Sequence, residues 1–583
     1  MDRPVRPRPI WRPSPRRNPL ALAVTAAAAI VVSVVVAWVN HDCIELVVAS
    51  SNEKFELLTD IASTYKPPSV DRKCVQVQVI KKASGSAERS LARDWADERQ
   101  PRPDVWSPAA TTWILLLTQD RKDAGLDEDV VLGVPQSLMQ SPLVIAMPEK
   151  MRDTLLRAEG KIGWDQIFGL AQDKDGWAKY GKPDWGQFKL GKTNPTISTS
   201  GLHALISVNY AAVGTADSDA FLAAVESRVV HYSDSVQTFL SNLRVADQRD
   251  EALTYVSAIA VEEKQVFDYN RGNPTSGLCR PTCPFLPPKE KLVPVYPIDG
   301  TLIADHPYAI LKWTDDAHRQ AALDFQSYLE STPIQRQFQA EGFRDYRRRL
   351  GPTLTGPTYD QSGSTFRLEP PDPAELAHML DIWSTVLRKP AHALFVVDVG
   401  RSMSDLGQGE TKTKLDLAKR AASDALKDLA PKDTIGLWTF PTKDGSRYRE
   451  SSSLSTPAAN TSELVRNVQL LDTLSDDESF YETVHASVDH LHSSFDPNRI
   501  NAVVVLTGGG YSLDDQKASG LISYLQGQRE DQRVRVSIVG YGTTPASNAI
   551  LRRIAEASRG SFYDVTDPTN TISEWMRNAM SNF

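Results

Sequence analysis

Apolar runs of strand length alternate with segments of helix length along most of this chain, and that alternation restricts its fold more than any other feature. Between Cys43 and about Leu350, "IELVVAS" is followed by "NEKFELLTDIASTY", "VQVQVI" by "AERSLARDWADE" and "PDVWSP" by "ATTWILLLTQ". The same order returns after Pro390, where "AHALFVVDV", "DTIGLWTF", "AVVVLTGG" and "RVSIVGYG" are separated by helical patterns. Repeated strand–helix order predicts an α/β fold with mostly parallel sheets and helices on their faces.

A segment rich in Gly, Pro, Ser and Thr separates these two regions. Residues 351–372, "GPTLTGPTYDQSGSTFRLEPPD", have little periodic apolar pattern, which indicates a linker, and "PAELAHMLDIWSTVLRK" after it indicates a helix. A chain of 583 residues is also too long for one ordinary domain. We therefore expect a basic tail at 1–18, a transmembrane anchor at 19–40, a two-lobed domain at 42–350, a linker and helix at 351–389, and a doubly wound α/β domain at 390–583.

The N-terminal region predicts a membrane anchor. Six arginines and six prolines occur in the first 19 residues, and an apolar run, Leu20 to Val39, follows them. At about 1.5 Å per residue such a run spans the roughly 30 Å of a bilayer core. A cleaved signal peptide is the alternative, but its apolar core is usually shorter and "AWVNHD" is a poor cleavage site. We expect a single-pass protein of the cell membrane, with its N-terminus in the cytoplasm and its bulk outside.

The cysteine content fits an extracytoplasmic location. There are four cysteines, Cys43, Cys74, Cys279 and Cys283, and outside the cytoplasm an even number indicates two disulfides. Cys43 and Cys74 each precede a strand-like run, so neighbouring parallel strands would bring them to the same end of a sheet. Zinc is the alternative, but no nearby histidine or further cysteine completes four ligands.

Charge and motifs exclude several classes of function. The formal net charge of −8 and the absence of a basic stripe in the folded part argue against nucleic-acid binding. The sequence has no G-x-S-x-G elbow, no H-E-x-x-H and no P-loop, so we do not expect an enzyme.

Several separated motifs of the first region resemble bacterial extracellular solute-binding proteins of the ABC-transporter type. They are "LVVASSNEKFELL", "ASGSAE", "FKLGKTNPTISTSGLHAL", "EEKQVFDYN" and "YPIDGTLIADHPYAIL". The resemblance covers roughly residues 42–350. It implies a periplasmic-binding-protein-like fold, in which two lobes close on a solute by a hinge motion.

Hydroxyl-rich loops in this region are candidates for solute binding, because open α/β sheets bind ligands at the carboxyl ends of their strands. Serines before a helix can offer hydroxyls and free N–H groups to an anion or a carbonyl oxygen, although they can also serve only as N-caps. The family resemblance adds Glu262 and Tyr269 as cleft or hinge positions, with ordinary packing as the alternative. Asp299 could bind a solute, but an Asp-Gly pair is also a common turn. The candidate residues are Ser50, Ser51, Ser84, Gly85, Ser86, Ser198, Thr199, Ser200, Glu262, Tyr269 and Asp299.

Residues 391–566 resemble a von Willebrand factor type A domain, whose family binds a divalent cation through three loops. Asp398 and Ser402 match the first loop, but Gly400 replaces its first serine. Glu478, or Ser479 if the match shifts by one, stands at the threonine position, and Gly508 replaces an aspartate. Because Mg²⁺ demands strict geometry, we expect this degenerate site to have lost tight metal binding, and we expect no other cofactor. Compensation by Glu478 or nearby aspartates is the alternative.

These features together predict a membrane-anchored, non-catalytic extracytoplasmic protein. It would couple a cleft for a small-molecule or anionic solute to a domain that binds an extracellular protein partner. The alternatives are a solute-capture component of an ABC transporter and a pure surface adhesion or scaffold protein.

Overall fold

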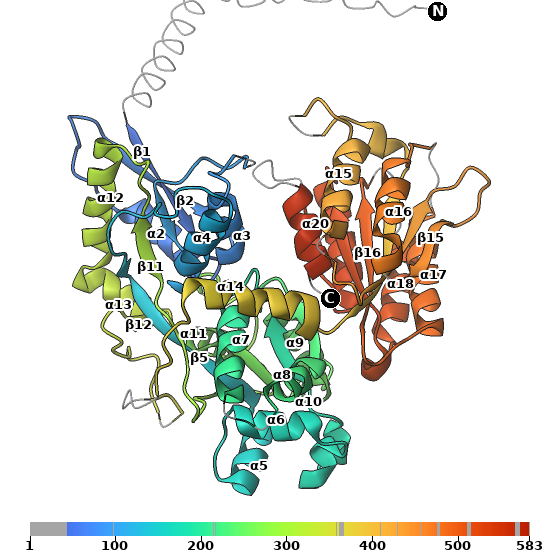
Figure 1. The fold of residues 1–583 in the computed structure, drawn as a ribbon, viewed down its shortest axis with the longest axis horizontal. Coiled ribbons are helices and arrows are strands. Elements are labelled where there is room, and N and C mark those ends of the chain that lie inside the picture. Colours follow the sequence, from blue (N-terminus) through green and yellow to red (C-terminus); the bar gives the residue numbers. More distant parts are fainter. Residues whose placement is uncertain are drawn as a thin grey trace, which may run out of the picture.

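The structure is a computed structural model of the chain. It describes residues 43–581 except 97, 214, 216, 281, 357, 361–365, 408–409, 428, 456, 475–478, 510–514 and 566–571. Strands in these residues form three sheets, which we call the sheets of lobe 1, lobe 2 and the C-terminal unit (Figure 1).

Lobe 1 is built on a sheet of order β2-β1-β3-β11-β4, in which β1, β2 and β3 run parallel and β11 pairs antiparallel with both β3 and β4. Its strands are β1 (Ile44–Ser50), β2 (Val75–Lys81), β3 (Val105–Ser107), β4 (Gln136–Ser137) and β11 (Pro307–Ile310). Its helices are α2 (Phe55–Thr64), α3 (Ser84–Leu91), α4 (Thr112–Asp123), α12 (Asp316–Leu329) and α13 (Thr332–Ala340).

Lobe 2 has a sheet of order β10-β5-β8-β6-β7, and β9 and β12 also pair with β5. Its strands are β5 (Met139–Pro148), β6 (Leu190–Thr193), β7 (Val229–Ser233), β8 (Ala258–Glu262), β9 (Leu292–Val295), β10 (Ile303–Ala304) and β12 (Arg344–Asp345). Its helices are α5 (Glu149–Glu159), α6 (Trp164–Gln172), α7 (Thr199–Ala212), α8 (Ser218–Ser227), α9 (Val236–Gln248), α10 (Ala252–Tyr255) and α11 (Glu263–Asn270), with short η1 (Gly176–Tyr180) and η2 (Pro183–Trp185). Chain segments pass between the lobes before β5 and again between β10 and β11, as a hinged pair of lobes requires.

The C-terminal unit has a sheet of order β15-β14-β13-β16-β17-β18, parallel except for β15. Its strands are β13 (Ala391–Asp398), β14 (Thr434–Phe440), β15 (Arg449–Ser455), β16 (Ile500–Thr507), β17 (Arg535–Gly540) and β18 (Phe562–Asp564). Its helices are α15 (Lys414–Lys427), α16 (Pro457–Gln469), α17 (Phe480–Ser493), α18 (Asp515–Gln526), α19 (Pro545–Ala557) and α20 (Ile572–Ser581), with short η4 (Arg401–Ser404) and η5 (Glu530–Gln532).

The continuous apolar character of β13 follows from its two-sided burial. Alternate side chains of a strand point to opposite faces, and here Phe395 and Val397 pack in one hydrophobic cluster while Leu394 and Val396 pack in another. Helices α15, α16 and α20 lie against one another, and α18 lies against α17 and α19. Helices on both faces explain why these strands have no polar alternation.

The predicted linker is partly packed against the lobes. Leu354 is fully buried, and Leu368 donates its N–H to the carbonyl oxygen of Thr301 at 2.9 Å. Helix α14 (Pro373–Ile382) then crosses between α4 of lobe 1 and α7 of lobe 2 (Figure 1). The turn η3 (Trp383–Leu387) follows it and buries Trp383. Apolar side chains spaced through this polar segment therefore hold it to the surface it crosses.

Both disulfides have the predicted pairing: Cys43 bonds to Cys74, and Cys279 bonds to Cys283. The first pair lies at the start of the parallel strands β1 and β2, where Ile44 is in register with Val75. Within the residues that the structure describes, no helix has both the length and the apolar character to cross a bilayer. The predicted tail and anchor, residues 1–40, lie outside the described residues.

Candidate functional site

Hydroxyl groups from both lobes meet in one pocket between them. Its lining includes Ser51 at the end of β1, Ser84 at the start of α3, and Ser198, Thr199 and Ser200 at the start of α7. All of these segments follow strands, so their meeting confirms that the strand ends of the two sheets face each other. The pocket has a volume of about 20 Å³, which is room for roughly one water molecule.

Ser200 is a buried residue of this pocket whose hydroxyl makes no internal hydrogen bond. It is 1% exposed, and its Oγ has no hydrogen-bond partner among the described residues. Thr199, in contrast, accepts a hydrogen bond of 2.8 Å from the indole N–H of Trp113 on α4. Ser84 accepts one of 3.1 Å from the backbone N–H of Ala109. Ser200 can therefore bind a solute without giving up an internal bond.

Glu53 and Glu262 line the pocket, and the buried Lys54 and His306 lie next to them. The Lys54 ammonium donates to Ser51 Oγ and, at 2.9 Å, to the carbonyl oxygen of Ser107. Ser51 in turn donates to Glu53, and His306 lies 3.4 Å from Glu53 and 3.6 Å from Glu262. The opposite charges of Lys54 and Glu53, 3.5 Å apart, offset part of the cost of burying each other.

Burial shifts the pKa values of these charged groups. It raises the pKa of Glu262 well above its usual range, and the carboxylate of Glu53 raises it further. Burial lowers the pKa of Lys54, although Glu53 opposes that shift. Burial also holds the pKa of His306 well below its usual range, so the imidazole is neutral. The pocket thus combines hydroxyls with a carboxyl group that stays protonated to higher pH than an ordinary glutamate.

Gly85 has a different role from the one that its loop suggested. A Cβ at this position would lie 2.2 Å from the carbonyl oxygen of Thr196 and 2.9 Å from the Cα of Ile197. The Gly85 N–H donates to the Ile197 carbonyl oxygen at 3.1 Å, and Arg89 donates to that of Thr196 at 2.7 Å. Glycine therefore allows the backbone of lobe 2 to rest directly on α3 of lobe 1, which closes the pocket.

Four other candidates do not reach the pocket. Ser50 is buried at the end of β1, and Ser86 lines a separate cavity beside Arg89 and Arg577. Tyr269 packs in the hydrophobic core of lobe 2, and Asp299 accepts a hydrogen bond from the N–H of Trp164 at the start of α6. The first three serve packing and the last caps a helix. Glu262 does line the pocket.

Sequence reasoning missed Glu53, Lys54, Asp234 and His306. Asp234 and Ser235 line the pocket from the loop after β7. The motif "SDS" after a strand was a signal of the same kind as "STS", and it could have been found. Glu53 and Lys54 follow Ser51 directly, but charged residues in a loop are normally exposed, so their burial had no sequence signal.

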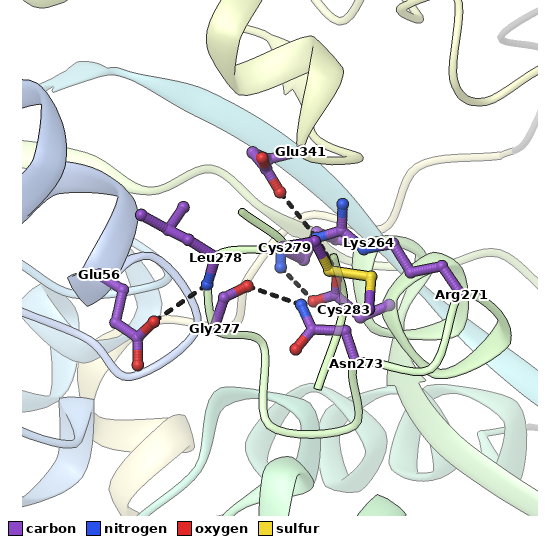
Figure 2. The surroundings of a disulfide bond; sticks show 10 residues. Glu56, Lys264, Arg271, Asn273, Gly277, Leu278, Cys279, Cys283 and Glu341 are labelled. Atoms are coloured by element: carbon purple, nitrogen blue, oxygen red, sulfur yellow. Dashed lines mark hydrogen bonds and ion pairs between the residues drawn. A yellow bond between two sulfur atoms is a disulfide. The ribbon is translucent and has the colours of Figure 1, made fainter. Parts of the chain in front are cut away.

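The loop of lobe 2 that the short disulfide closes also contacts lobe 1. Figure 2 shows the Cys279–Cys283 loop beside Glu56, which accepts a hydrogen bond of 3.0 Å from the N–H of Leu278. Arg280 in the same loop pairs with Asp60 at 2.7 Å. Glu56 and Asp60 both belong to α2 of lobe 1, so this loop is a second contact that holds the lobes together.

The degenerate metal loop of the C-terminal unit is held by internal hydrogen bonds. Asp398 is buried, and its Oδ1 accepts the N–H of Gly400 at 2.8 Å. Its Oδ2 accepts the hydroxyl of Thr507 at 2.8 Å and the N–H of Gly508 at 3.2 Å. Burial raises the pKa of Asp398. Ser402 Oγ lies 2.8 Å from where a Cβ on Gly508 would be, so the first and third loops meet.

The described residues of the first and third loops offer few side-chain oxygens. Gly400 and Gly508 supply none, and both oxygens of Asp398 accept internal hydrogen bonds. Across the part of the chain that the structure describes, no three His, Cys, Asp or Glu side chains are grouped to hold a metal. Glu478 lies outside the described residues.

The C-terminal unit contacts both lobes. Glu574 on α20 pairs at 2.9 Å with Lys82, which follows β2 of lobe 1. Arg559, after α19, pairs with Glu251 of lobe 2, and its guanidinium lies 4.9 Å from the ring of Tyr255. Arg559 also accepts, at its carbonyl oxygen, a hydrogen bond of 3.3 Å from Asn242 on α9. The pocket and the C-terminal unit are thus joined through both lobes.

Comparisons with known proteins find several that are similar to this chain. Two curated proteins of Mycobacterium tuberculosis, the uncharacterized proteins MT1884 (strain CDC 1551 / Oshkosh) and Rv1836c (strain ATCC 25618 / H37Rv), are each 22% identical to this chain over 512 residues, covering 85% of this chain and 70% of the relative.

Solved structures match parts of the chain. The sulfate-binding protein SubI of Mycobacterium tuberculosis H37Rv is 15% identical with a TM-score of 0.34, covering 52% of this chain and 87% of SubI. A von Willebrand factor type A structure from Catenulispora acidiphila is 18% identical with a TM-score of 0.26, covering 34% of this chain and 43% of that one. The profile of the family described as "Bacterial extracellular solute-binding protein" matches residues 46–344. Because that match takes in just over half of the chain, the chain belongs to the bacterial extracellular solute-binding protein family.

Proposed function

We propose that this chain is a non-catalytic binding protein that encloses a small polar solute between lobe 1 and lobe 2 and presents a type A protein-interaction domain to an extracellular partner. Membership of the family implies an extracytoplasmic location. The observation that carries the proposal is the meeting of Ser51, Ser84 and Ser198–Ser200 from both lobes in one pocket with a buried, unbonded hydroxyl on Ser200.

We further propose the division into a solute-binding domain at 42–350, a linker and helix at 351–389 and a type A domain at 390–583. The apolar run at 19–40 would hold all three parts beside the membrane, with the basic tail at 1–18 in the cytoplasm. The doubly wound sheet of the C-terminal unit supports the type A assignment, since β13 ends at Asp398 and β16 ends at Thr507 on the same edge.

Solute entry would be coupled to the position of the C-terminal unit. A pocket of about 20 Å³ admits nothing larger than water, so the lobes must separate to take up a solute. The C-terminal unit bonds to Lys82 of lobe 1 and to Glu251 of lobe 2, so separation must break or strain at least one of these contacts. A solute that favours one arrangement would therefore shift the presentation of the type A domain.

A scaffold without a solute is the second candidate. The direct contact of Gly85 with the backbone of Thr196 and Ile197 favours the scaffold, because lobes packed this closely leave almost no volume for a solute in the pocket. Delivery of a captured solute to an ABC permease is the third, and the family membership supports it.

Solute binding is expected to depend on Ser200. In a thermal-stability screen of the full chain with sulfate, phosphate, amino acids and monosaccharides, a bound solute at 100 times its Kd should stabilise the protein by about 2.7 kcal/mol. Replacing Ser200 by alanine should weaken that binding about tenfold, which corresponds to the net worth of a typical hydrogen bond.

Ser207→Ala is the matched control for this experiment. Ser207 lies on the same helix, is equally buried and also has an Oγ with no partner among the described residues, but it does not line the pocket. It should bind the solute as well as the unaltered chain does. A screen without any stabilising solute would favour the scaffold, and equal effects of the two substitutions would place the solute elsewhere.

The C-terminal unit is expected to bind no divalent cation tightly. Addition of magnesium or of EDTA should leave the melting temperature of the full chain unchanged. Neither addition should shift the melting temperature of the Asp398→Asn variant from the value that this variant has without them. The reason is that the hydrogen bonds from Gly400, Thr507 and Gly508 already occupy the Asp398 carboxylate. Saturable heat on titration with magnesium or manganese that disappears in Asp398→Asn would contradict this expectation.

A further inference from the structure

A larger chamber lies at the mouth of the interlobe pocket, and all three parts of the protein build its walls. Asn52, Ala83, Ile197, Asp234 and Ser235 line both spaces, so the two are continuous. The chamber has a volume of about 690 Å³, which is within the range of pockets that hold organic ligands. Helices α9 of lobe 2 and α20 of the C-terminal unit both contribute residues to its lining.

Each of the three parts contributes one cation that lies over an aromatic ring in the lining. Lys81 of lobe 1 lies 5.8 Å from the ring of Phe55. Arg244 of lobe 2 lies 3.8 Å from the ring of Phe285, and Arg552 of the C-terminal unit lies 5.1 Å from that of Phe562. All six side chains line the chamber. Ring contacts of this kind hold a cation in place while leaving its N–H groups available.

These three cations have no carboxylate bound to them. Among the described residues, no hydrogen bond or ion pair engages the ammonium of Lys81 or the guanidinium of Arg244 or Arg552. The fourth basic residue of the lining, Lys82, is paired with Glu574 at 2.9 Å and with Glu98 at 3.0 Å. The chamber therefore holds three cations whose donors are open to a ligand.

The acidic residues of the lining do not cancel this charge. Besides Glu574, they are Asp234 and Glu556. Burial raises the pKa of Glu556, although Arg552 and Arg244 oppose that shift, so Glu556 loses its proton at higher pH than an exposed glutamate. Three open cations against Asp234 and Glu556 leave the chamber with a net preference for negative charge.

We propose that this chamber binds an organic polyanion, a molecule larger than a single inorganic ion that carries two or more phosphate or carboxylate groups. The cations come from three different parts of the protein, and a chamber of about 690 Å³ is far larger than one inorganic oxyanion, so it suits a ligand with several anionic groups. Guanidinium groups bind phosphate and carboxylate oxygens through paired N–H donors, and the rings of Phe55, Phe285 and Trp575 offer apolar surface to the body of the ligand. The C-terminal unit is then part of the ligand site, and binding there does not require a solute in the interlobe pocket.

The test is calorimetric titration of the full chain with inositol hexakisphosphate and fructose 1,6-bisphosphate as phosphate probes, citrate and trigalacturonate as carboxylate probes, and maltotriose as a neutral probe. At least one polyanion should bind, with an affinity that falls as salt is added, and maltotriose should not. Which group of probes binds identifies the oxyanion. Arg244→Gln and Arg552→Gln should each weaken that binding at least about tenfold, since each removes a charge-assisted contact.

Arg102→Gln is the matched control, because Arg102 lies 3.8 Å from the ring of Trp313 but outside the chamber. It should leave polyanion binding unchanged. Arg552 is exposed, so its substitution tests the site even if Arg244→Gln unfolds lobe 2. The inference is overturned if no polyanion binds, if the three substitutions act alike, or if maltotriose competes. It is also overturned if Ser200→Ala, rather than the arginine substitutions, abolishes binding, and that result would leave the proposed solute function standing.

Discussion

Replacing Arg559 by alanine is expected to lower the free energy of unfolding by about 3 kcal/mol, the lower end of the range for breaking a buried ion pair, because Glu251 is 37% exposed and Glu530 keeps its pair with Arg533. The Arg559 side chain is fully buried and pairs with Glu251 of lobe 2 and, at 2.8 Å, with Glu530 of its own unit. The same guanidinium covers the ring of Tyr255. The loss should appear in scanning calorimetry as two separated transitions where the unaltered chain has one, because the C-terminal unit no longer unfolds together with lobe 2.

The exposed ion pair of Arg529 and Asp531 provides the control. Its partners are 74% and 57% exposed, and exposed pairs contribute at most about 1 kcal/mol. Arg529→Ala should therefore leave the calorimetric profile nearly unchanged. If Arg559→Ala changes the calorimetric profile no more than Arg529→Ala does, the ion pairs of Arg559 do not stabilise the contact between the C-terminal unit and lobe 2.

Acid should weaken the same contact. Burial alone would raise the pKa of Glu530, but the guanidinium groups of Arg559, Arg533 and Arg535 outweigh it and hold the pKa below its ordinary value. A carboxyl group with a depressed pKa stabilises the fold above its unfolded pKa, about 4.3 for glutamate, and that stabilisation disappears as the pH falls through the folded pKa. The unaltered chain should lose this contribution below about pH 4, and Arg559→Ala should lose less.

Replacing Trp383 by alanine is also expected to cost about 3–5 kcal/mol, as large aromatic side chains in cores do. Trp383 is 1% exposed and packs edge-on against Tyr232 with ring centroids 5.1 Å apart. Tyr232 donates to Glu226 at 2.6 Å and accepts the N–H of Lys389 at 3.0 Å. The cavity would therefore lie where the chain that leads into β13 is held to lobe 2. Urea denaturation of the full chain measures the loss.

Two substitutions separate this cavity effect from a local effect on the turn. Trp383 Nε1 has no hydrogen-bond partner in the described part of the chain, so Trp383→Phe removes no hydrogen bond and should cost less than Trp383→Ala. Val386 lies in the same turn and is 59% exposed, so Val386→Ala should be close to neutral. If the free energy of unfolding of Trp383→Ala lies within about 0.5 kcal/mol of that of the unaltered chain, Trp383 does not anchor the segment that leads into β13 to lobe 2.

The candidate site was predictable where its chemistry follows a strand. Ser51 and Ser84 follow the neighbouring parallel strands β1 and β2, whose carboxyl ends share one edge of a sheet, so their closeness followed from local pattern. Ser198–Ser200 follow β6 in the sheet of lobe 2, and only the packing of the two lobes brings them opposite these two serines. Asp299 and Tyr269 were suggested by an isolated motif or by resemblance, and the structure uses one as a helix cap and the other in a core. Lys54 and His306 could not be expected, because their burial depends on each other and on Glu53, which the sequence does not reveal.

The sequence by itself determined the strands, the helices that cover them and the cysteine pairs, since each depends on periodicity or on residues that neighbouring strands bring together. Only the tertiary structure decided how the parts meet. The contact at Gly85, the buried pairing of Arg559 with Glu251 and the three cations around one chamber join residues that are far apart in the chain. Such contacts form between the surfaces of elements that are already folded. The residues of these surfaces follow no periodic pattern in the sequence, so the sequence does not predict which surfaces meet.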